Sequence, residues 1–424
     1  MKILIVGGGG REHAIAWKLS KENNVEKIYC APGNAGIAKV AQCVNISDSD
    51  IENLVKFAKE NNIDLTVVGP EVPLVNGIVD EFEKEGLKIF GPNKECSTFE
   101  GSKSFSKDFM IRHNIPTAKY KEYTNLDEAI SEIDSFGYPV VIKADGLAAG
   151  KGVVIPENRE DAINTLKEMM SDKKFGSAGD KVVIEEFLSG IETSILAFVD
   201  NDTIVPMVSA KDHKKVYNFE KGPNTGGMGT FSPSEIYTDE LSKEISEKVL
   251  NRTLQGFKKD NLNYKGVLFI GLMITEDGPK VLEYNVRFGD PETQSVLFRL
   301  ETDLHKIMEA ILDNKLKDIE INYKKEEAVC VMLTSGGYPE DYEKGKVITG
   351  LEDLDEDIVV FHSGTKMLDG NLVTNGGRVI GITTSAGSVE EAAKKVYKNI
   401  EKINFEGMHY RSDIGIKFCE EISF

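Results

Sequence analysis

The chain has 424 residues, more than one hydrophobic core usually organises, so we expect two to four domains. Hydrophobic residues make up 40% and charged residues 29%, proportions typical of a soluble globular protein. The formal net charge of −19 disfavours nucleic acid or an anionic membrane as a partner, because both require a basic protein face. A phosphorylated substrate would therefore need locally concentrated basic groups.

The apolar segments and the cysteines exclude further classes. The first apolar run is short and leads straight into glycines, so it predicts a strand and not a signal peptide. No run of 18 apolar residues is present, and we expect a cytoplasmic protein without a membrane span. Five scattered cysteines without a C-x-x-C pair, and six histidines without metal spacing, predict neither disulfides nor zinc.

Residues 1–100 alternate apolar runs with amphipathic segments. Strands are expected at residues 2–6, 27–30, 65–68 and 88–90, and helices at residues 12–21, 51–61 and 77–85. This alternation predicts a parallel sheet whose ligands bind beyond the carboxyl ends of the strands, at glycine-rich residues 7–10, 32–36 and 69–71. The dinucleotide fingerprint needs glycine where Glu12 stands, so a phosphate at the start of the first helix is expected instead of a nicotinamide cofactor.

Residues 140–154 read V-V-I-K-A-D-G-L-A-A-G-K-G-V-V, two β-branched runs around a glycine loop. We expect a hairpin that brings backbone N–H groups and the ammonium groups of Lys143 and Lys151 onto a phosphate chain. The Walker phosphate loop is excluded, because Gly146 and Gly150 have three residues between them instead of four. The alternative is a mobile glycine hairpin with solvated lysines.

The segments beside the hairpin predict a small mixed domain. Residues 101–137 are expected to be helical and polar. Ser102 or Ser104 would cap a helix that begins near Lys103, residues 115–117 would break it, and a second helix would run over residues 127–136. By itself, Lys103 is most simply a surface lysine. A helix near residues 159–170 and an apolar strand at residues 181–188 follow the hairpin.

An unusual loop follows the two strands expected within residues 192–208. It contains D-H-K at residues 212–214 and G-P-N-T-G-G-M-G at residues 222–229, and no periodic structure explains it. Long ordered loops of this kind usually carry function. Beyond it, we expect a helix at residues 239–259 and a hairpin of strands at residues 266–275 and 279–283.

The second strand of that hairpin leads into E-Y-N-V-R-F-G-D-P-E-T-Q. Residues two apart share a face of a strand, so Glu283, Asn285 and Arg287 are expected to lie together. A carboxylate and an amide oxygen suit Mg²⁺, and the arginine fork suits carboxylate or phosphate oxygens. The alternative is an exposed polar sheet face.

The chain after residue 294 predicts two helices and then a compact α+β unit. The helices are expected at residues 294–300 and 304–316. Strands at residues 328–333, 359–363 and 378–384 precede a helix at residues 389–403.

Together the motifs resemble the phosphoribosylamine–glycine ligase family of the ATP-grasp superfamily, essentially from end to end. The hairpin alone would also fit biotin carboxylases or carboxyaminoimidazole ribonucleotide synthases, whereas the motifs at residues 222–229 and 283–294 are highly specific. The motifs that carry the resemblance begin at residue 9 (G-G-R-E-H-A), 32 (P-G-N-A-G), 69 (G-P-E-V-P-L), 100 (E-G-S-K), 143 (K-A-D-G-L-A-A-G-K-G-V), 185 (E-E-F-L-S-G), 212 (D-H-K), 222 and 283.

The resemblance implies an α/β and α+β multidomain protein: an ATP-grasp fold with an N-terminal parallel-sheet domain and a C-terminal α+β domain. The implied boundaries are 1–102 for the N-terminal domain, 103–122 with 192–325 for the central domain, 123–191 for a lid, and 326–424. The implied reaction, in purine biosynthesis, joins glycine to 5-phosphoribosylamine with ATP and Mg²⁺ or Mn²⁺. It gives glycinamide ribonucleotide, ADP and phosphate through a glycyl phosphate. A monomer that binds only small molecules is expected.

The resemblance also implies roles for residues. Those expected to bind ATP are Lys103, Lys143, Gly150, Lys151, Gly152, Glu185, Glu186, Leu188 and Glu192. Glu283 and Asn285 would hold the metal, and Arg287 would steady the transferred phosphoryl group. The expected neighbours of glycine and the attacking amine are Asp212, Asn224, Thr225, Gly226 and Asp290. Gly9, Gly10 and Asn34 would take the ribose 5-phosphate.

Two other functions compete with this interpretation. A related ATP-grasp enzyme would activate bicarbonate or another carboxylate, and only the D-P-E-T-Q and N-T-G-G-M-G runs argue against it. A non-catalytic nucleotide-binding or dinucleotide-sensing protein would bind ligand without turnover, which the intact Glu283, Asn285 and Arg287 disfavour.

Overall fold

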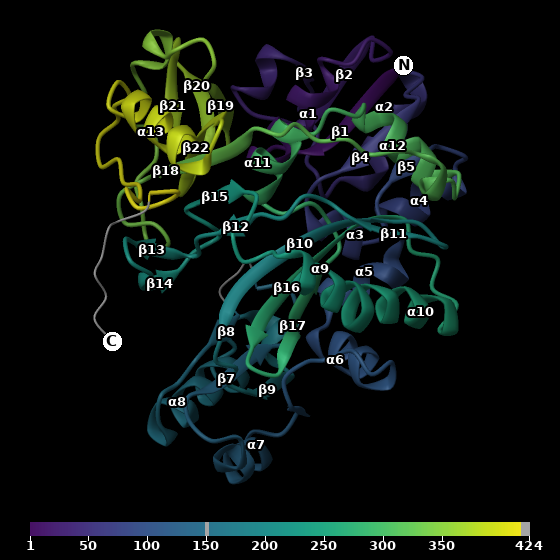
Figure 1. The fold of residues 1–424 in the computed structure, drawn as a ribbon, viewed down its shortest axis with the longest axis vertical. Helices are drawn as coiled ribbons and strands as arrows, with labels where there is room; N and C mark the ends of the chain where they lie inside the picture. The colour runs from purple at the N-terminus through teal and green to yellow at the C-terminus, as the bar shows by residue number, and fades with distance from the viewer. Residues whose placement is uncertain (149–151, 417–424) are drawn as a thin grey trace.

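The computed structural model describes residues 1–148 and 152–416. Its N-terminal part is the predicted parallel sheet, in the order β3-β2-β1-β4-β5 (Figure 1, upper right). The strands are β1 (Lys2–Gly7), β2 (Lys27–Pro32), β3 (Gln42–Cys43), β4 (Leu65–Val68) and β5 (Ile89–Phe90). The helices are α1 (Gly10–Leu19), α2 (Ile51–Glu60), α3 (Glu71–Val75), α4 (Ile78–Lys84) and α5 (Lys94–Gly101). The sequence pattern did not indicate β3, α3 or α5, which are too short to show a clear period.

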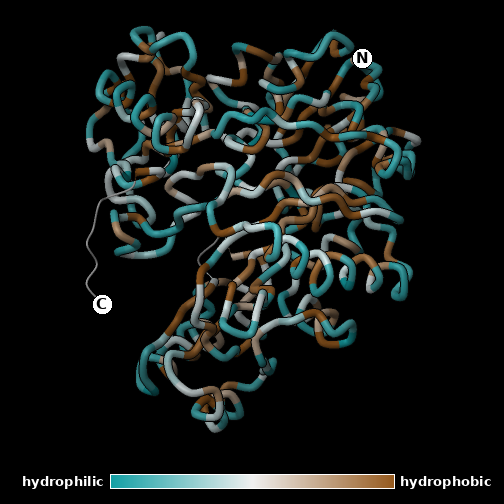
Figure 2. The backbone as a smooth tube through the Cα atoms, viewed as in Figure 1, coloured by the Kyte–Doolittle hydropathy of each residue, from teal (hydrophilic) through white to brown (hydrophobic). Residues whose placement is uncertain are grey.

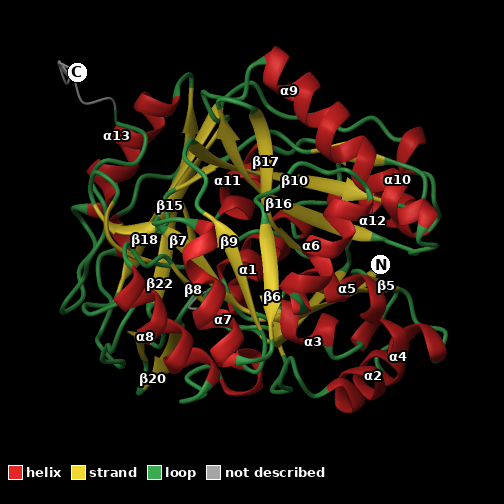
Figure 3. Ribbon diagram, turned by 90° about the horizontal axis from the view of Figure 1, so that it is seen from below, coloured by secondary structure: helices red, strands yellow, loops and turns green. Residues whose placement is uncertain are grey.

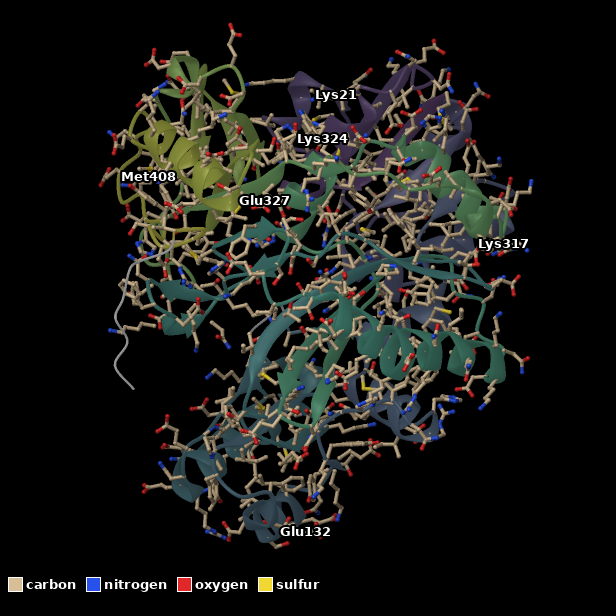
Figure 4. All side chains as sticks on the ribbon, viewed as in Figure 1. Lys21, Glu132, Lys317, Lys324, Glu327 and Met408 are labelled. Atoms are coloured by element: carbon tan, nitrogen blue, oxygen red, sulfur yellow. The ribbon has the colours of Figure 1, made fainter. Side chains whose placement is uncertain are left out.

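Strands β6–β9 and helices α7 and α8, which we call the lid, project from the rest of the molecule (Figure 1). Their sheet is antiparallel in the order β6-β9-β7-β8, and the glycine hairpin forms as predicted between β7 and β8. The elements are β6 (Tyr120–Tyr123), α7 (Leu126–Glu132), β7 (Val140–Ala144), β8 (Val153–Val154), α8 (Arg159–Met170) and β9 (Val182–Glu186). Seen from below, the lid lies nearest the viewer (Figure 3), and Glu132 marks its outer end (Figure 4).

The two helices expected on either side of a break near residues 115–117 are present, but the strand between them was not expected. This strand, β6, lies between α6 (Lys103–Arg112) and α7 and pairs with β9. In β6, Tyr123 is buried and Lys121 and Glu122 are exposed, so the strand offers one apolar side chain to the lid core. Such a short edge strand gains its stability from the neighbouring strand, which a local pattern does not reveal.

The central sheet lies next to the lid and has the antiparallel order β11-β10-β16-β17. Its strands are β10 (Ile191–Val199), β11 (Ile204–Pro206), β16 (Gly266–Thr275) and β17 (Gly278–Asn285). They agree with the predicted strand–turn–strand and hairpin patterns. Helices α9 (Asp239–Ile245) and α10 (Asn251–Lys259), joined by one π-helical segment, form the helix expected at residues 239–259.

The C-terminal sheet, β12-β15-β18-β22-β19, recruits two strands from the central part of the chain. They are β12 (Lys211–Asp212) and β15 (Gly229–Ser232), while β13 (Lys215–Tyr217) and β14 (Lys221–Asn224) form a separate hairpin. The loop expected at residues 212–229 is therefore mostly paired. The sequence of this segment lacks the alternation typical of a strand. Strand β15 pairs with β18, which lies about a hundred residues further along the chain, and a local sequence pattern contains no information about such a distant partner.

The remaining C-terminal elements follow the prediction with one addition. They are β18 (Glu327–Thr334), β19 (Val359–His362), β20 (Thr365–Leu368), β21 (Asn371–Thr374), β22 (Arg378–Ala386) and α13 (Val389–Ile400). The hairpin β20–β21 was not predicted. Helices α11 (Glu292–Arg299) and α12 (Leu304–Leu312) connect this part to the central sheet.

Apolar residues divide into separate cores. Figure 2 marks the apolar segments of the chain in brown. The lid has its own core around Ile142, Ile184 and Leu166. The parallel sheet and the central sheet instead share clusters, such as the one that joins Leu4, Ile195 and Val286. The lid therefore contributes little apolar packing to its neighbours. Within the described residues, no helix is long and apolar enough to cross a membrane.

Candidate functional site

A cavity of about 580 Å³ lies between the lid sheet and the central sheet. It gathers most of the side chains that the sequence predicts to bind ATP, metal or substrate. The predicted residues that line it are Lys103, Lys143, Gly152, Glu185, Glu186, Leu188, Glu192, Asp212, Asn224, Thr225, Gly226, Glu283, Asn285, Arg287 and Asp290. Gly150 and Lys151 lie outside the described residues. Residues far apart in the chain thus share one site.

The lid presents one face of its sheet to the cavity. Ile142 and Ile184 point into the lid core, and the alternation of a strand turns Val141, Lys143 and Glu185 to the opposite side. Apolar residues of the lid, the central sheet and α6 complete a slot, and they are Met110, Ala118, Val153, Leu188, Met273 and Leu282. Apolar walls from two facing sheets suit a flat heterocyclic base.

Two lysines project between the sheets, of which Lys143 is buried and Lys103 half-buried. Lys143 Nζ lies 2.9 Å from Glu185 Oε1 and donates to the Leu282 carbonyl at 3.1 Å. Lys103 Nζ donates to the Gly146 carbonyl at 3.0 Å, and burial lowers the pKa of Lys103. Both ammonium groups are therefore held partly by backbone carbonyls, which an anionic ligand would outcompete.

The glycines of the hairpin permit close packing. A Cβ atom at Gly152 would lie 2.6 Å from the Ala148 side chain, closer than real contacts allow. Gly152 therefore keeps the two sides of the loop together at the cavity wall.

The predicted metal-binding pair is intact. Asn285 Nδ2 lies 3.4 Å from Glu283 Oε1, and both residues line the cavity at the end of β17. Burial favours a higher pKa for Glu283, but Lys214, Lys143 and Lys103 outweigh it and hold the pKa below its ordinary value. The pair therefore presents an ionised carboxylate and an amide oxygen, a donor set that fits Mg²⁺.

Arg287 follows β17, which ends at Asn285, so it is not on the strand as the prediction had it. It nevertheless lines the same cavity. Its guanidinium lies 2.9 Å from Glu100 and 3.3 Å from Glu71. Burial raises the pKa of Glu100, whereas Arg287 and Arg11 more than offset burial and lower the pKa of Glu71. Two carboxylates thus fix the direction of Arg287.

The D-H-K segment places two charged side chains in the cavity. Lys214 forms an ion pair with Glu192, the residue predicted to bind ribose hydroxyls. Burial raises the pKa of Asp212, and the neighbouring carboxylate of Glu292 raises it further. Asp212 Oδ1 is buried, and no described residue donates a hydrogen bond to it. This oxygen is an acceptor that an ammonium group of a ligand would satisfy.

The glycine loop of residues 222–229 packs against the D-P-E-T-Q turn. A Cβ atom at Gly227 would lie 2.4 Å from Pro291. Arg378, from β22, donates to the carbonyls of Gly226 and Asp290 at 2.6 and 2.7 Å, and it lies 3.2 Å from the Asp290 carboxylate. Arg378 therefore joins both motifs to the C-terminal sheet.

The residues predicted to hold the ribose phosphate lie at the edge of this region. Gly9 and Gly10 begin α1, and a Cβ atom on either would lie 3.6 Å from the Asp290 carboxylate. Asn34 donates to the carbonyls of Gly8 and His362 at 2.8 Å, so its amide fastens the loop. Neither the two glycines nor Asn34 is among the residues that line the cavity. Their contact with a substrate stays a prediction.

Sequence reasoning missed several charged residues of the cavity. They are Arg11, Glu71, Glu100, Lys107, Lys214, Glu292 and Arg378. All except Lys107 and Arg378 lie within the motifs that carry the family resemblance, so the sequence could have indicated that they belong to the site. Arg378 follows a turn-like glycine pair and carries no local signal.

Two facing antiparallel sheets that enclose lysines, a carboxylate–amide pair and a half-buried arginine define a protein of the ATP-grasp class. Three domain models of one family match the chain. They are described as the N domain, the ATP-grasp (A) domain and the C domain of phosphoribosylglycinamide synthetase, and they match residues 1–100, 101–293 and 328–417. The chain belongs to this family of ligases.

Individual relatives agree. The chain is 53% identical over 414 residues to a phosphoribosylamine–glycine ligase of Caldanaerobacter subterraneus, covering 98% of this chain and 99% of that one. It is 49% identical over 421 residues to the enzyme of that name from Halalkalibacterium halodurans, covering 99% and 98%.

Solved structures show the same fold. The phosphoribosylamine–glycine ligase of Thermotoga maritima matches with a TM-score of 0.84 at 36% identity, over 98% of this chain and all of that one. A biotin carboxylase from Campylobacter jejuni matches with a TM-score of 0.75 at 14% identity, over 96% of this chain and 92% of that one. At that identity the second likeness concerns the fold alone.

Proposed function

We propose that the protein joins glycine to 5-phosphoribosylamine, with conversion of ATP to ADP and phosphate, and forms glycinamide ribonucleotide. The observation that carries the proposal is one cavity in which an apolar slot, phosphate-directed lysines and the Glu283–Asn285 pair adjoin the two family-specific motifs. The relatives that match this chain over nearly its full length carry the name of this ligase.

The chemistry requires that glycine is activated first. A carboxylate is a poor electrophile, so its oxygen attacks the γ-phosphorus of ATP and forms a glycyl phosphate with loss of ADP. The amine of phosphoribosylamine then attacks the acyl carbon and expels phosphate. Lys103, Lys143 and Lys214 surround the negative charge that moves, so that catalysis is mainly positioning and charge neutralisation.

Glu283 and Asn285 would hold Mg²⁺ or Mn²⁺, because an ionised carboxylate and an amide oxygen fit such an ion. When bound, the ion supplies positive charge to phosphate oxygens. Glu71 and Glu100 aim Arg287 at the same region, where it would steady the transferred phosphoryl group. The lid sheet excludes water from the acyl phosphate.

Asp212 and Asp290 would face the two amines. The buried acceptor oxygen of Asp212 suits the ammonium group of glycine, and the loop at residues 224–226 lies beside it in the cavity. The attacking amine must lose a proton as the new bond forms. Asp212 would accept it, because burial and then Glu292 raise its pKa, whereas Arg378 helps to hold the pKa of Asp290 below its ordinary value. The N-terminus of α1 at Gly9 and Gly10 would take the ribose phosphate, with Asn34 holding the loop.

The proposed organisation has N-terminal (1–102), central (103–122 with 192–325) and C-terminal (326–424) domains and a small ATP-grasp domain at residues 123–191. This small domain contains all of the lid except residues 120–122 of β6. The separate hydrophobic core of the lid supports its assignment as a domain of its own. We also propose that the enzyme works in the cytoplasm as a monomer.

One assay tests the function. Purified protein with ATP, Mg²⁺, glycine and phosphoribosylamine is expected to release ADP, and omission of either co-substrate should abolish the release. A panel that replaces glycine with bicarbonate and other carboxylates distinguishes a different ATP-grasp ligase. Nucleotide binding without turnover in any mixture would instead indicate a non-catalytic protein.

A further inference from the structure

Lys107 is a buried cation at the base end of the cavity that no motif indicated. It lies on α6, its side chain is 2% exposed, and it lines the cavity together with Glu185. Its Nζ donates to Thr117 Oγ1 at 2.7 Å and to the Ala118 carbonyl at 3.3 Å, and lies 2.9 Å from Glu185 Oε2. All three ammonium hydrogens thus have acceptors, so the side chain is fixed.

Glu185 is held between two ammonium groups. One carboxylate oxygen faces Lys107, and the other lies 2.9 Å from Lys143. The second oxygen, Oε1, is buried, and within the described part of the chain it accepts no well-aligned hydrogen bond. A buried acceptor with spare capacity, beside an apolar slot, calls for a donor from the ligand.

The Lys107–Glu185 ion pair also crosses the boundary between lid and core, whereas the Lys143–Glu185 pair lies within the lid sheet. Lys107 belongs to α6, Glu185 and Lys143 belong to the lid sheet, and Lys143 reaches back to the Leu282 carbonyl of β17. Thr117 continues this chain, because its hydroxyl donates to the Val281 carbonyl at 2.6 Å. The position of Glu185 relative to β17 therefore depends on Lys107.

We propose that Lys107 is a positioning residue for nucleotide choice: it fixes Glu185 so that the carboxylate oxygen that faces Lys143 also accepts a hydrogen bond from the 6-amino group of adenine and rejects the 6-oxo group of guanine. The proposal rests on the ATP site of the proposed function. A carboxylate accepts hydrogen bonds and donates none, so opposite a carbonyl oxygen it leaves two buried acceptors facing each other. Discrimination of this kind is strong, because the wrong base leaves buried polar groups unpaired.

Substitution of Lys107 should weaken this selection. In Lys107→Met the carboxylate has one ammonium partner and no fixed direction. We expect the KM for ATP to rise about tenfold to a hundredfold, with the KM for glycine and kcat nearly unchanged. The ratio of kcat/KM for ATP over GTP should fall at least tenfold. Lys107→Arg should restore part of this ratio, since it returns the positive charge.

Binding experiments separate this proposal from the reaction itself. Calorimetric titration with ADP and with GDP requires no turnover, so the preference for adenine and its loss in Lys107→Met remain measurable if the ligase assay fails. Glu185→Gln should also reduce the ratio of ADP affinity to GDP affinity, because the amide of glutamine can donate an N–H group to the 6-oxo group of guanine. The matched control is Lys18→Met, which removes a buried ammonium that donates to the Leu300 carbonyl away from the cavity.

The outcomes decide clearly. Loss of adenine preference in Lys107→Met and Glu185→Gln, partial rescue in Lys107→Arg and unchanged preference in Lys18→Met support the proposal. The proposal is refuted if a folded Lys107→Met variant keeps the wild-type ratio of ADP affinity to GDP affinity. It is also refuted by an equal loss of affinity for both nucleotides, which would mean that Lys107 shapes the pocket without selecting the base.

Discussion

At the scale of single residues, the charge of Glu283 depends on its neighbours. Burial alone would favour the protonated carboxyl, yet Lys214, Lys143 and Lys103 hold its pKa below the ordinary value. The same lysines are the groups proposed to receive phosphates. Without a ligand, the lysines therefore neutralise the carboxylate of Glu283. When a phosphate chain binds with its metal ion, the lysines would pair with phosphate oxygens and the carboxylate with the ion.

We expect Glu283→Ala to fold and to lose metal-dependent turnover by about a hundredfold or more, since the ion loses its only charged protein ligand in the pair. Steady-state rates measured across a Mg²⁺ titration check this. Glu276→Ala, at the exposed tip of the same hairpin, is the control. An unchanged rate at saturating Mg²⁺ would show that Glu283 does not bind the metal.

Arg378 is the second residue-scale prediction. Its guanidinium joins Gly226 and Asp290, so Arg378→Met should disturb the side of the site proposed for glycine and the amine. Loss of charge-assisted hydrogen bonds of about 1.5–3 kcal/mol predicts a rise of roughly tenfold to a hundredfold in the KM for phosphoribosylamine, with the KM for ATP nearly constant. Arg159→Met, on the exposed face of the lid, should change neither constant. A selective effect on ATP would contradict the assignment.

At the scale of elements, the lid is attached to the core by polar contacts more than by apolar ones. Asp145, at the end of β7, accepts hydrogen bonds from the Ser104 amide and hydroxyl at 2.9 Å and from the Ser102 hydroxyl at 3.2 Å. Ser102 is also the N-cap of α6, as predicted. The carboxylate therefore lies at the positive end of that helix, where a negative charge is stabilised.

Asp145→Asn should loosen this attachment without unfolding the lid, whose core is separate. The amide keeps one acceptor but loses the charge, which predicts a cost of about 1–2 kcal/mol and a rise of roughly fivefold to thirtyfold in the KM for ATP. Kinetics together with hydrogen exchange of α6 and β7 measure the effect. Asp172→Asn, on the exposed end of the lid, is the matched control. Equal effects of both substitutions would show that the contact is not specific.

The local sequence pattern was sufficient to predict helices and strands that have a clear hydrophobic period. It was insufficient for strands that form only because a distant strand pairs with them. The hairpin of β7 and β8, the strand β16 and the helix α8 agree with the prediction, because alternating or helical periods exist within each segment. By contrast, β6 and β15 exist because distant strands, β9 and β18, pair with them. In the site, Glu283 and Asn285 were identified together, whereas Lys107 and Arg378 were not, since their partners lie far along the chain.

At the scale of the whole molecule, the N-terminal and C-terminal parts meet through buried histidines. The His362 amide donates to His13 Nδ1 at 2.8 Å, and the Asn34 amide donates to the His362 carbonyl. Burial, with smaller contributions from His362 and Lys39, lowers the pKa of His13 to about 3. Burial, with a smaller contribution from Lys39, lowers the pKa of His362 to about 4. Both rings are therefore neutral in the folded protein at physiological pH.

This interface predicts acid sensitivity. Between the folded pKa values of about 3 and 4 and the ordinary value of 6.5, the unfolded chain binds more protons than the folded one, so stability falls as the pH drops below 6.5. Each histidine contributes at most about 1.4 kcal/mol per pH unit in that window. Urea unfolding at about pH 7 and pH 5 measures the difference, and His13→Gln with His362→Gln should reduce it. An identical pH slope in the double variant would assign the sensitivity to other groups.

The sequence by itself determined the parallel sheet, the glycine hairpin, the class of ligase and the adjacency of Glu283 and Asn285, the pair proposed to bind the metal. These features are encoded in short segments whose period or spacing reflects their own geometry. Only the tertiary structure decided which charges meet: it placed Lys107 and Lys143 on opposite oxygens of Glu185, and Arg378 on Asp290. Ion pairs of this kind depend on distances between strands and helices that fold together from distant parts of the chain, and no local pattern contains those distances.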